Sequence, residues 1–457
     1  MKVDVLVAEI GSTTTVVNAF DGIHNGAPLF VGQGQANTTV TDGDVRIGLE
    51  QAILDLKKNL GEDALTYDEL FATSSAAGGL KMTVHGLVFD MTARAAREAA
   101  LGAGAVLHMV TAGKLRRTDL QKIRDIHPNL ILIAGGVDYG ERDTAIYNSE
   151  LIAGLGTKIP VIYAGNVENQ EEVRLIFGDT GQDLFIVENV YPKIDDLNIE
   201  PTRKVIQEAF EKHIREAPGM EHIYDVVSEN VIPTPGSVMN MTRLLYEKIG
   251  SLLVIDVGGA TTDVHSVADD TEAVAQILVS PEPKAKRTVE GDLGLFVNLD
   301  NVVELFGEDA IQEEGFDLEA IHREYTGIPS TDEERRFILR MTEIAAATAL
   351  QRHAGKLRYV YGPSGRTTLA EGKDLTSVRT IIGTGGALSQ LDGAKEILKK
   401  LVLLDSDDAT VKLLPRGNGV TILLDRDYIM ASLGVLSMKY PEAALQLLEH
   451  SLDYTFV

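Results

Sequence analysis

Cysteine and tryptophan are both absent from this chain of 457 residues. Without cysteine it has no disulfide, no zinc–thiolate site, no cysteine-bound iron–sulfur cluster and no cysteine nucleophile. Positive charge is also scarce, because 42 Lys and Arg stand against 68 Asp and Glu and leave a net charge of −26. A surface this acidic repels phosphate backbones, and no Lys/Arg-rich run offsets it. We therefore expect no nucleic-acid partner.

Long apolar runs are missing as well. No stretch approaches the roughly 18 apolar residues that a membrane-spanning helix needs. The N-terminal apolar run is interrupted by Asp4 and Glu9, which is a strand pattern and not the apolar core of a signal peptide. We therefore expect a cytoplasmic protein with no membrane segment.

The residues that are present predict an α/β fold. Hydrophobic residues make up 44% and charged residues 24% of the chain, an ordinary globular composition. The length is enough for about three domains. Glycine is abundant (43) and proline sparse (14), and the glycines follow short Val/Ile/Leu runs. Such runs, alternating with helical segments, indicate buried strands between helices.

The individual elements follow from the same patterns. Thr331 and Glu334 predict a capping box at the start of a long helix that ends at Gly355. The expected strands cover residues 3–8, 14–20, 129–134, 159–164, 252–256 and 379–382, and the other expected helices cover residues 44–60, 91–101, 141–153, 202–216 and 237–249.

A strand, a carboxylate and a glycine turn follow one another near the N-terminus. Glu9 ends the strand, and Gly11 lets the backbone approach a ligand closely. The hydroxyl residues of the turn are Ser12, Thr13 and Thr14. Hydroxyls and backbone N–H groups donate hydrogen bonds to phosphate oxygens. Because Glu9 has the same sign of charge as phosphate, its expected role is to hold a hydrated Mg²⁺ that the phosphates also bind.

The same order recurs in the second half, where a strand ends at Asp256 and a second carboxylate, Asp263, follows the turn. The residues of this turn are Gly258, Gly259, Thr261 and Thr262. A third turn, after the strand 379–382, has no acidic residue and suits close packing against a nucleoside; it consists of Gly383, Thr384, Gly385 and Gly386. Each turn alone is typical of ordinary structural turns. The three in this order are much more specific.

That order resembles the actin-like ATPase superfamily, which includes sugar kinases, actin and the seventy-kilodalton heat-shock chaperones. The resemblance implies an α/β fold in which two ribonuclease H-like ATPase domains face each other across a nucleotide cleft, with an inserted α/β region. The first domain would cover residues 1–139 and the second residues 251–457. Residues 140–250 would form the insertion, a candidate partner-binding region.

The resemblance also implies roles for the residues of the three turns. The first phosphate loop would be Gly11, Ser12, Thr13 and Thr14, the second Gly258, Gly259, Thr261 and Thr262, and the adenosine turn Gly383, Thr384, Gly385 and Gly386. Glu9 and Asp256 would organise Mg²⁺, and Asp263 would orient the attacking water. The superfamily usually has Asp in place of Glu9, whose extra methylene moves the carboxylate outward by about 1.5 Å. This departure bears on ATP hydrolysis more than on nucleotide binding.

Further stretches resemble the glutamate mutase accessory family, often called MutL or GlmL. They are residues 74–82, 132–138, 232–236, 287–294 and 427–434. Members of this family are associated with adenosylcobalamin-dependent mutases acting on amino acids. The resemblance implies a chaperone-like reactivating factor that hydrolyses ATP to ADP and phosphate. Movement of its domains would open the mutase, so that damaged cobalamin leaves. Which mutase is served stays open.

Two alternatives in the same superfamily remain, a small-molecule kinase and a filament-forming actin relative. The kinase would need an acceptor-binding loop with an aspartate base, for which the sequence offers no distinct candidate. The ATP-driven activators of 2-hydroxyacyl-CoA dehydratases hold an iron–sulfur cluster through cysteines and are therefore excluded. The ten histidines form no pair at metal-ligand spacing, and His85 alone merits inspection.

Overall fold

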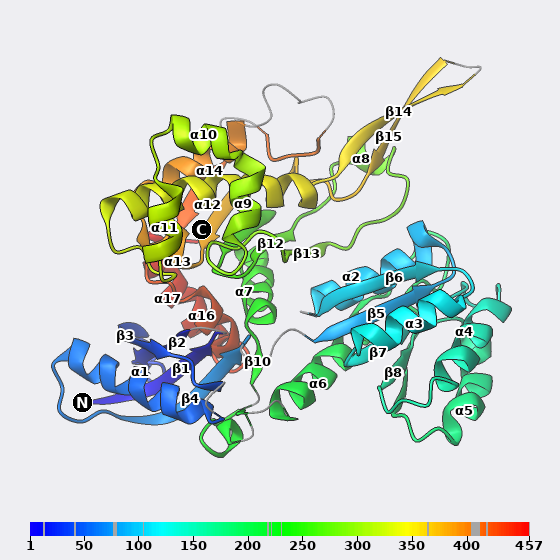
Figure 1. The fold of residues 1–457 in the computed structure, drawn as a ribbon, viewed down its shortest axis with the longest axis horizontal. Helices are drawn as coiled ribbons and strands as arrows, with labels where there is room; N and C mark the ends of the chain where they lie inside the picture. Colours follow the sequence, from blue (N-terminus) through cyan, green and yellow to red (C-terminus); the bar gives the residue numbers. More distant parts are fainter. Residues whose placement is uncertain are drawn as a thin grey trace. The chain divides into compact units, whose positions relative to one another are not determined.

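The computed structural model describes residues 1–456 except 12–13, 41–42, 76–79, 104, 217–218, 221, 230, 363–364, 404–411 and 417–418. The chain forms two compact units, Met1–Ser237 and Val238–Val457. Among the described residues, the first unit contains two five-stranded sheets, and the second contains one five-stranded sheet and a two-stranded ribbon (Figure 1).

The first sheet of the first unit has the order β3-β2-β1-β4-β10. Its strands are β1 (Lys2–Ile10), β2 (Thr14–Asp21), β3 (Leu29–Asn37), β4 (Thr66–Ser74) and β10 (Ile232–Pro233). β1, β2 and β3 form an antiparallel meander, whereas β4 and β10 continue the sheet in parallel with β1. Helix α1 (Val45–Leu60) connects β3 to β4 and begins at Asp44, whose carboxylate accepts from the backbone N–H of Arg46.

The main sheet of the second unit repeats this topology. Its strands are β11 (Leu252–Val257), β12 (Thr262–Val267), β13 (Ala285–Glu290), β16 (Thr380–Thr384) and β17 (Thr421–Leu424). The order is β13-β12-β11-β16-β17, again an antiparallel meander extended by two parallel strands. Helix α12 (Asp332–His353) lies within the long connection from β13 to β16, whereas α1 is the helix that connects β3 to β4 in the first unit. Two ribonuclease H-like sheets with the same strand order confirm the predicted fold class.

The remaining elements of the second unit surround its sheet. The predicted capping box is confirmed, because Thr331 Oγ1 accepts from the N–H of Glu334 and Glu334 Oε2 accepts from the N–H of Thr331, both at 3.1 Å. The ribbon of β14 (Lys356–Gly362) and β15 (Gly365–Glu371) projects from this unit (Figure 1). The other helices are α7 (Thr234–Ile249), which crosses the boundary between the units, α8 (Glu272–Ala275), α9 (Leu299–Phe306), α10 (Glu308–Glu313), α11 (Leu318–Glu324), α13 (Gly386–Gln390), α14 (Ala394–Leu403), α16 (Met430–Leu436) and α17 (Pro441–Leu452).

The second sheet of the first unit is entirely parallel. Its strands are β5 (Lys81–Gly86), β6 (Val106–Ala112), β7 (Leu130–Ile133), β8 (Val161–Tyr163) and β9 (Leu184–Ile186), in the order β6-β5-β7-β8-β9. Its helices are η2 (Phe89–Ala93, a π-helix), α2 (Arg94–Gly102), α3 (Arg117–Ile126), α4 (Asp143–Ala153), η3 (Val167–Asn169), α5 (Gln170–Gly178), α6 (Glu200–Glu216) and η4 (Ile223–Asp225). The boundary expected near residue 140 lies within this sheet, between β7 and α4. The division into three domains stays a prediction.

Helices cover both faces of this parallel sheet. Alanines of α2 and the apolar side of α6 pack on one face, against Leu130, Leu132 and Ile162. Helices α3, α4 and α5 pack on the other face, against Ile131, Ile133 and other alternate strand residues. The central strand β7 is therefore a continuous apolar run that is buried on both faces, as the sequence shows for Leu130–Ile133. No helix in the described part of the chain is long and apolar enough to span a membrane.

Candidate nucleotide and metal site

Both ribonuclease H-like sheets turn from their first to their second strand in the same way. The backbone N–H of Gly11 donates to Thr14 O at 3.0 Å, and that of Gly258 donates to Thr261 O at 2.9 Å. In each case the turn follows a strand that carries an acidic residue two positions before the glycine. The two predicted motifs are therefore equivalent hairpins of equivalent sheets.

The first hairpin holds its carboxylate inside the sheet. Glu9 is 6% exposed and accepts from Asn18 Nδ2 at 3.5 Å. The carbonyl of Gly11 accepts from the hydroxyl of Thr38 at 2.8 Å, which fixes the turn. Thr14 is partly buried at the start of β2, whereas Ser12 and Thr13 lie outside the described residues.

The second hairpin lies against the glycine turn that follows β16. Asp256 of β11 is in register with Asp263 of β12 on one side and with Thr384 of β16 on the other. Gly385 follows with a φ of +89°, and a Cβ there would lie 2.7 Å from Asp256 Oδ1 and 2.4 Å from Val257 O. Only glycine fits this approach. The structure thus brings two of the predicted motifs together around Asp256.

Two further residues belong to this cluster, Asp425 and Arg287. Asp425, fully buried at the end of β17, accepts from the hydroxyls of Thr384 at 2.8 Å and Ser451 at 2.7 Å and from two backbone N–H groups. Arg287 of β13 donates from Nε at 3.0 Å and from Nη2 at 2.6 Å to Asp263 Oδ1. Thr261 Oγ1 donates to the other oxygen of Asp263 at 3.1 Å.

Sequence reasoning did not identify Asp425 or Arg287. The strand 421–424 followed by an acidic residue repeats the pattern of the other motifs, so Asp425 was detectable from that signal. Arg287 lies within a stretch that carries the family resemblance, but nothing in its spacing indicates a partner for Asp263. That pairing depends on the register of β12 with β13.

Asp256 differs from the other two carboxylates of the cluster. Among the described residues, none donates a hydrogen bond to it, whereas Asp263 and Asp425 each have several donors. Burial, together with the nearby charges of Asp263 and Asp425, raises the pKa of Asp256 to about 7, and the charge of Arg287 opposes this rise. A cation bound here would offset this repulsion between carboxylates. Mg²⁺ is usually held by one or two carboxylates together with waters and phosphate oxygens, so the carboxylate of Asp256 fits this ion.

Several predicted nucleotide-binding groups are engaged within the protein. The hydroxyl of Thr262 donates to Leu293 O at 2.7 Å, and that of Thr384 donates to Asp425. Gly383 is buried in β16, where a Cβ would contact the side chains of Leu398 and Leu424. By contrast, Gly259 is exposed and Gly386 has open space at its Cβ position. The ligand roles of all these residues stay predictions.

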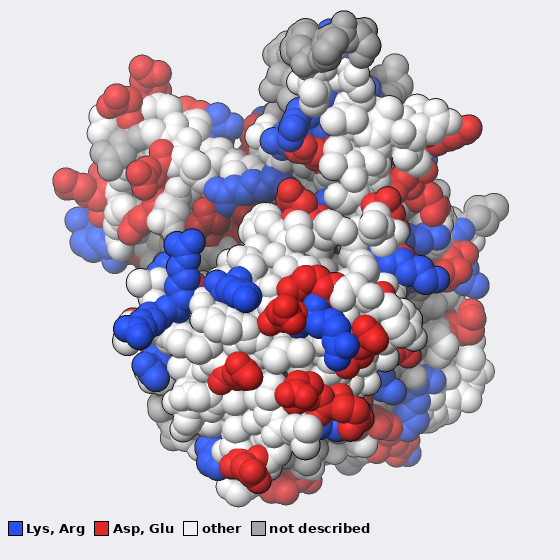
Figure 2. Space-filling model, turned by 90° about the vertical axis from the view of Figure 1, so that its right-hand side faces the viewer, with Lys and Arg blue, Asp and Glu red and all other residues white. Residues whose placement is uncertain are grey.

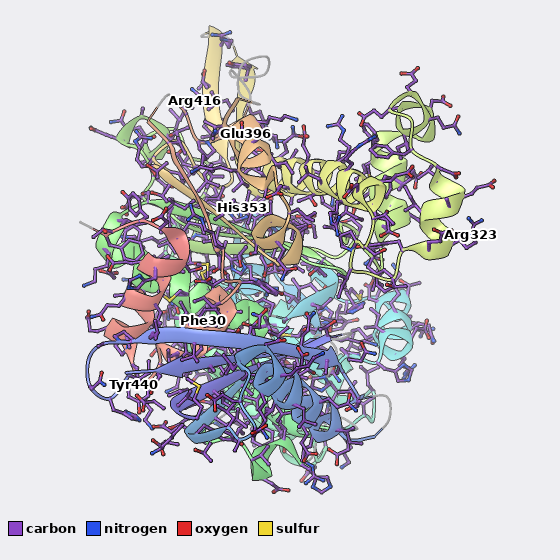
Figure 3. The ribbon with its side chains drawn as sticks, turned by 90° about the vertical axis from the view of Figure 1, so that its left-hand side faces the viewer. Phe30, Arg323, His353, Glu396, Arg416 and Tyr440 are labelled. Carbon is purple, nitrogen blue, oxygen red and sulfur yellow. The ribbon has the colours of Figure 1, made fainter. Side chains whose placement is uncertain are left out.

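Neighbouring charged and polar groups are likewise paired. Arg352 of α12 contacts Glu290 at 2.7 Å and Asp292 at 2.8 Å, which accounts for the acidic turn after β13. His353, at the end of α12 (Figure 3), contacts Ser266 Oγ at 2.8 Å and Thr288 Oγ1 at 2.9 Å. These contacts tie α12 to the strands that carry the site.

The repeated sheet and its hairpins define an actin-type ATPase fold. The family model described as MutL protein matches residues 5–452. The chain belongs to this MutL family. Protein MutL of Clostridium tetanomorphum is 36% identical over 460 residues, covering 97% of this chain and 98% of that protein.

Two solved structures are similar at low sequence identity. Diol dehydratase-reactivating factor in its nucleotide-free form is 12% identical, with a TM-score of 0.37, and the match covers 96% of this chain and 99% of that one. Glycerol dehydratase reactivase is 10% identical, with a TM-score of 0.34, and the match covers 95% and 99%.

Proposed function

We propose that this chain is a Mg²⁺-dependent ATPase that reactivates an adenosylcobalamin-dependent amino-acid mutase. The proposed ATPase activity is supported mainly by the position of Asp256. Its carboxylate has no hydrogen-bond donor among the described residues and lies between a phosphate-type hairpin and a glycine turn with close backbone approach. Membership of the MutL family supports the mutase part.

Each residue of the cluster has a distinct role in this proposal. Asp256 would hold Mg²⁺, which when bound neutralises phosphate charge. Arg287 holds Asp263 through one oxygen and Thr261 holds the other, so that Asp263 is fixed in orientation. Its second oxygen retains a lone pair with which to orient an attacking water. Glu9 would supply the equivalent carboxylate of the first unit.

ATP then acts by favouring one arrangement of the two units over another. A ligand shifts such an equilibrium only by its difference in affinity for the two arrangements. In this proposal the resulting movement loosens the mutase and lets damaged cobalamin leave. Residues 140–250 are proposed to contribute to the mutase contact. Figure 2 shows acidic and basic side chains interspersed among uncharged ones on one face, with no single sign dominating there.

Calorimetric titration with Mg·ATP tests the site directly. We expect micromolar binding by the parent chain and a loss of about tenfold or more in Asp256→Asn, because the amide cannot neutralise Mg²⁺. Asp270→Asn is the matched control, because burial also raises the pKa of Asp270, which lies beyond the other end of β12. Equal binding by the parent and Asp256→Asn would show that the site is assigned wrongly.

The reactivating role needs its own measurement. A glutamate mutase inhibited by bound cyanocobalamin should regain activity with this chain, ATP and fresh adenosylcobalamin, but not when Asp256→Asn replaces the parent. Transfer of phosphate from ATP to a small-molecule acceptor would instead support a kinase.

A further inference from the structure

The hairpin after β11 is bordered by the segment 291–298, which connects β13 to α9. Two consecutive carbonyls of the hairpin, those of Gly258 and Gly259, accept from backbone N–H groups of this segment at 2.8–3.1 Å. The segment also approaches very closely at Gly294, where a Cβ would lie 2.5 Å from the carbonyl of Ala260. Backbone contacts from one segment therefore hold one side of the hairpin.

The last residue of the segment, Asn298, adds a side chain to these contacts. Its Nδ2 donates to Ala260 O at 2.8 Å and to Gly291 O at 2.9 Å. An amide nitrogen has two N–H donors, and both are used here. Asn298 is also the N-cap of α9, a position where asparagine commonly accepts from the first turn of the helix, but its side chain makes no such bond. The side chain thus links the hairpin to the start of the segment instead of capping the helix.

These bound carbonyls determine where the N–H groups of the hairpin point. In a trans peptide the C=O of one residue and the N–H of the next point to opposite sides, and the described residues contain no cis peptide bond. The carbonyls of Gly258, Gly259 and Ala260 all accept from the segment 291–298. The N–H groups of Gly259, Ala260 and Thr261 therefore point away from this segment.

The three N–H groups are available to a ligand. Within the described part of the chain they donate to no other group. Gly259 is exposed, and Ala260 and Thr261 are partly buried, so solvent reaches the hairpin. Successive backbone N–H groups in a turn bind anions, and they do so best when the protein fixes them before the anion arrives.

We infer that Asn298 is a positioning residue for the phosphate groups of ATP. It is the donor to Ala260 O among the described residues, and through that peptide it directs the N–H of Thr261 toward the anion. The two preceding carbonyls are held by backbone donors, so a side-chain substitution at position 298 releases this one peptide. The inference rests on the proposed function, which supplies the phosphate that these N–H groups bind.

Calorimetric titration of the chain with Mg·ATP and, separately, with adenosine tests this role. We expect Asn298→Ala to weaken Mg·ATP binding about five- to tenfold, because one N–H donor is no longer fixed. Adenosine binding should not change, because adenosine has no phosphate. Asn301→Ala is the matched control, since Asn301 is exposed on the same helix and has no described hydrogen bond to the hairpin.

Asn298→Asp separates positioning of the hairpin from capping of α9. Aspartate is as good an N-cap as asparagine, but its carboxylate has no N–H to donate. We expect this variant to weaken Mg·ATP binding at least as much as Asn298→Ala does, whereas a residue that only capped the helix would tolerate the change. Asn301→Asp controls for the added negative charge on the same helix.

Parent-like Mg·ATP binding by Asn298→Ala would overturn the inference. An equal loss of Mg·ATP and adenosine binding would also overturn it, because it would indicate general damage to the unit. Titration of Asp256→Asn separates this inference from the proposed function. Mg·ATP binding that depends on Asp256 but not on Asn298 contradicts only the positioning role, and the reverse result contradicts only the metal site. No Mg·ATP binding by the parent chain contradicts both.

Discussion

Three histidines are buried at strands or strand contacts, His85, His265 and His353. Burial lowers the pKa of His85 to about 4 and lowers the pKa of the other two well below the usual value. Neither ring nitrogen of His265 has a hydrogen-bond partner among the described residues. All three side chains are therefore neutral in the folded protein at pH 7, and mild acid opposes folding at each of them.

For His85, a falling pH favours the unfolded chain. Its folded pKa of about 4 lies below the usual 6.5, so the unfolded chain binds the proton more readily between these values. Above about pH 6.5 the titration of His85 does not change the free energy of unfolding. As the pH falls below this value, it lowers that free energy, by up to about 3 kcal/mol near pH 4. We expect the free energy of unfolding, measured with urea at pH 7 and pH 5, to decline less in His85→Gln than in the parent chain.

His450→Gln serves as the control for this measurement, because His450 is exposed. An unchanged pH dependence in His85→Gln would mean that His85 becomes solvated before the unit unfolds.

At the scale of elements, α1 and β3 approach each other unusually closely at Gly34. A Cβ at this position would lie 2.3 Å from Ala52 O and 2.3 Å from the Leu56 nitrogen, both backbone atoms of the helix. We expect Gly34→Ala to lower the free energy of unfolding by about 1–3 kcal/mol, because helix and strand must separate. Gly178→Ala, with open space at the end of α5, should be neutral or slightly stabilising. If Gly34→Ala and Gly178→Ala changed the free energy of unfolding equally in urea denaturation, this packing argument would be contradicted.

Elements with a strong local signal could be predicted from the sequence. The apolar run 129–134 and the capping residues Thr331 and Glu334 depend on neighbours in the chain, and the structure has β7 and α12 there. Both strand–glycine hairpins were predictable for the same reason. The parallel sheet of the first unit was not assembled from these signals, because its strand order depends on which faces α2 and α6 bury. The same limit applies to Arg287, whose contact with Asp263 requires two strands in register.

At the scale of the whole molecule, the net charge of −26 opposes compaction. Salt shortens the range of this repulsion from about 30 Å at 0.01 M to about 8 Å at 0.15 M. We expect the midpoint of thermal unfolding to rise over this range of NaCl, measured by scanning calorimetry without nucleotide. KCl should have the same effect if screening is the cause. A falling midpoint would indicate that ion pairs such as Arg352 with Glu290 outweigh the general repulsion.

The pairing of β4 with β10 has a consequence for how the chain folds. Ile232 and Pro233 complete the edge of a sheet whose other strands all lie before residue 75, so the intervening segment must be synthesised before that edge is covered. Until then the nascent chain exposes the edge of β4, whose residues 70–74 are buried in the finished protein. Such an open edge pairs readily with other chains. Aggregation during synthesis should therefore depend on how fast residues 75–231 emerge and fold, and slowing their translation should lower the soluble yield.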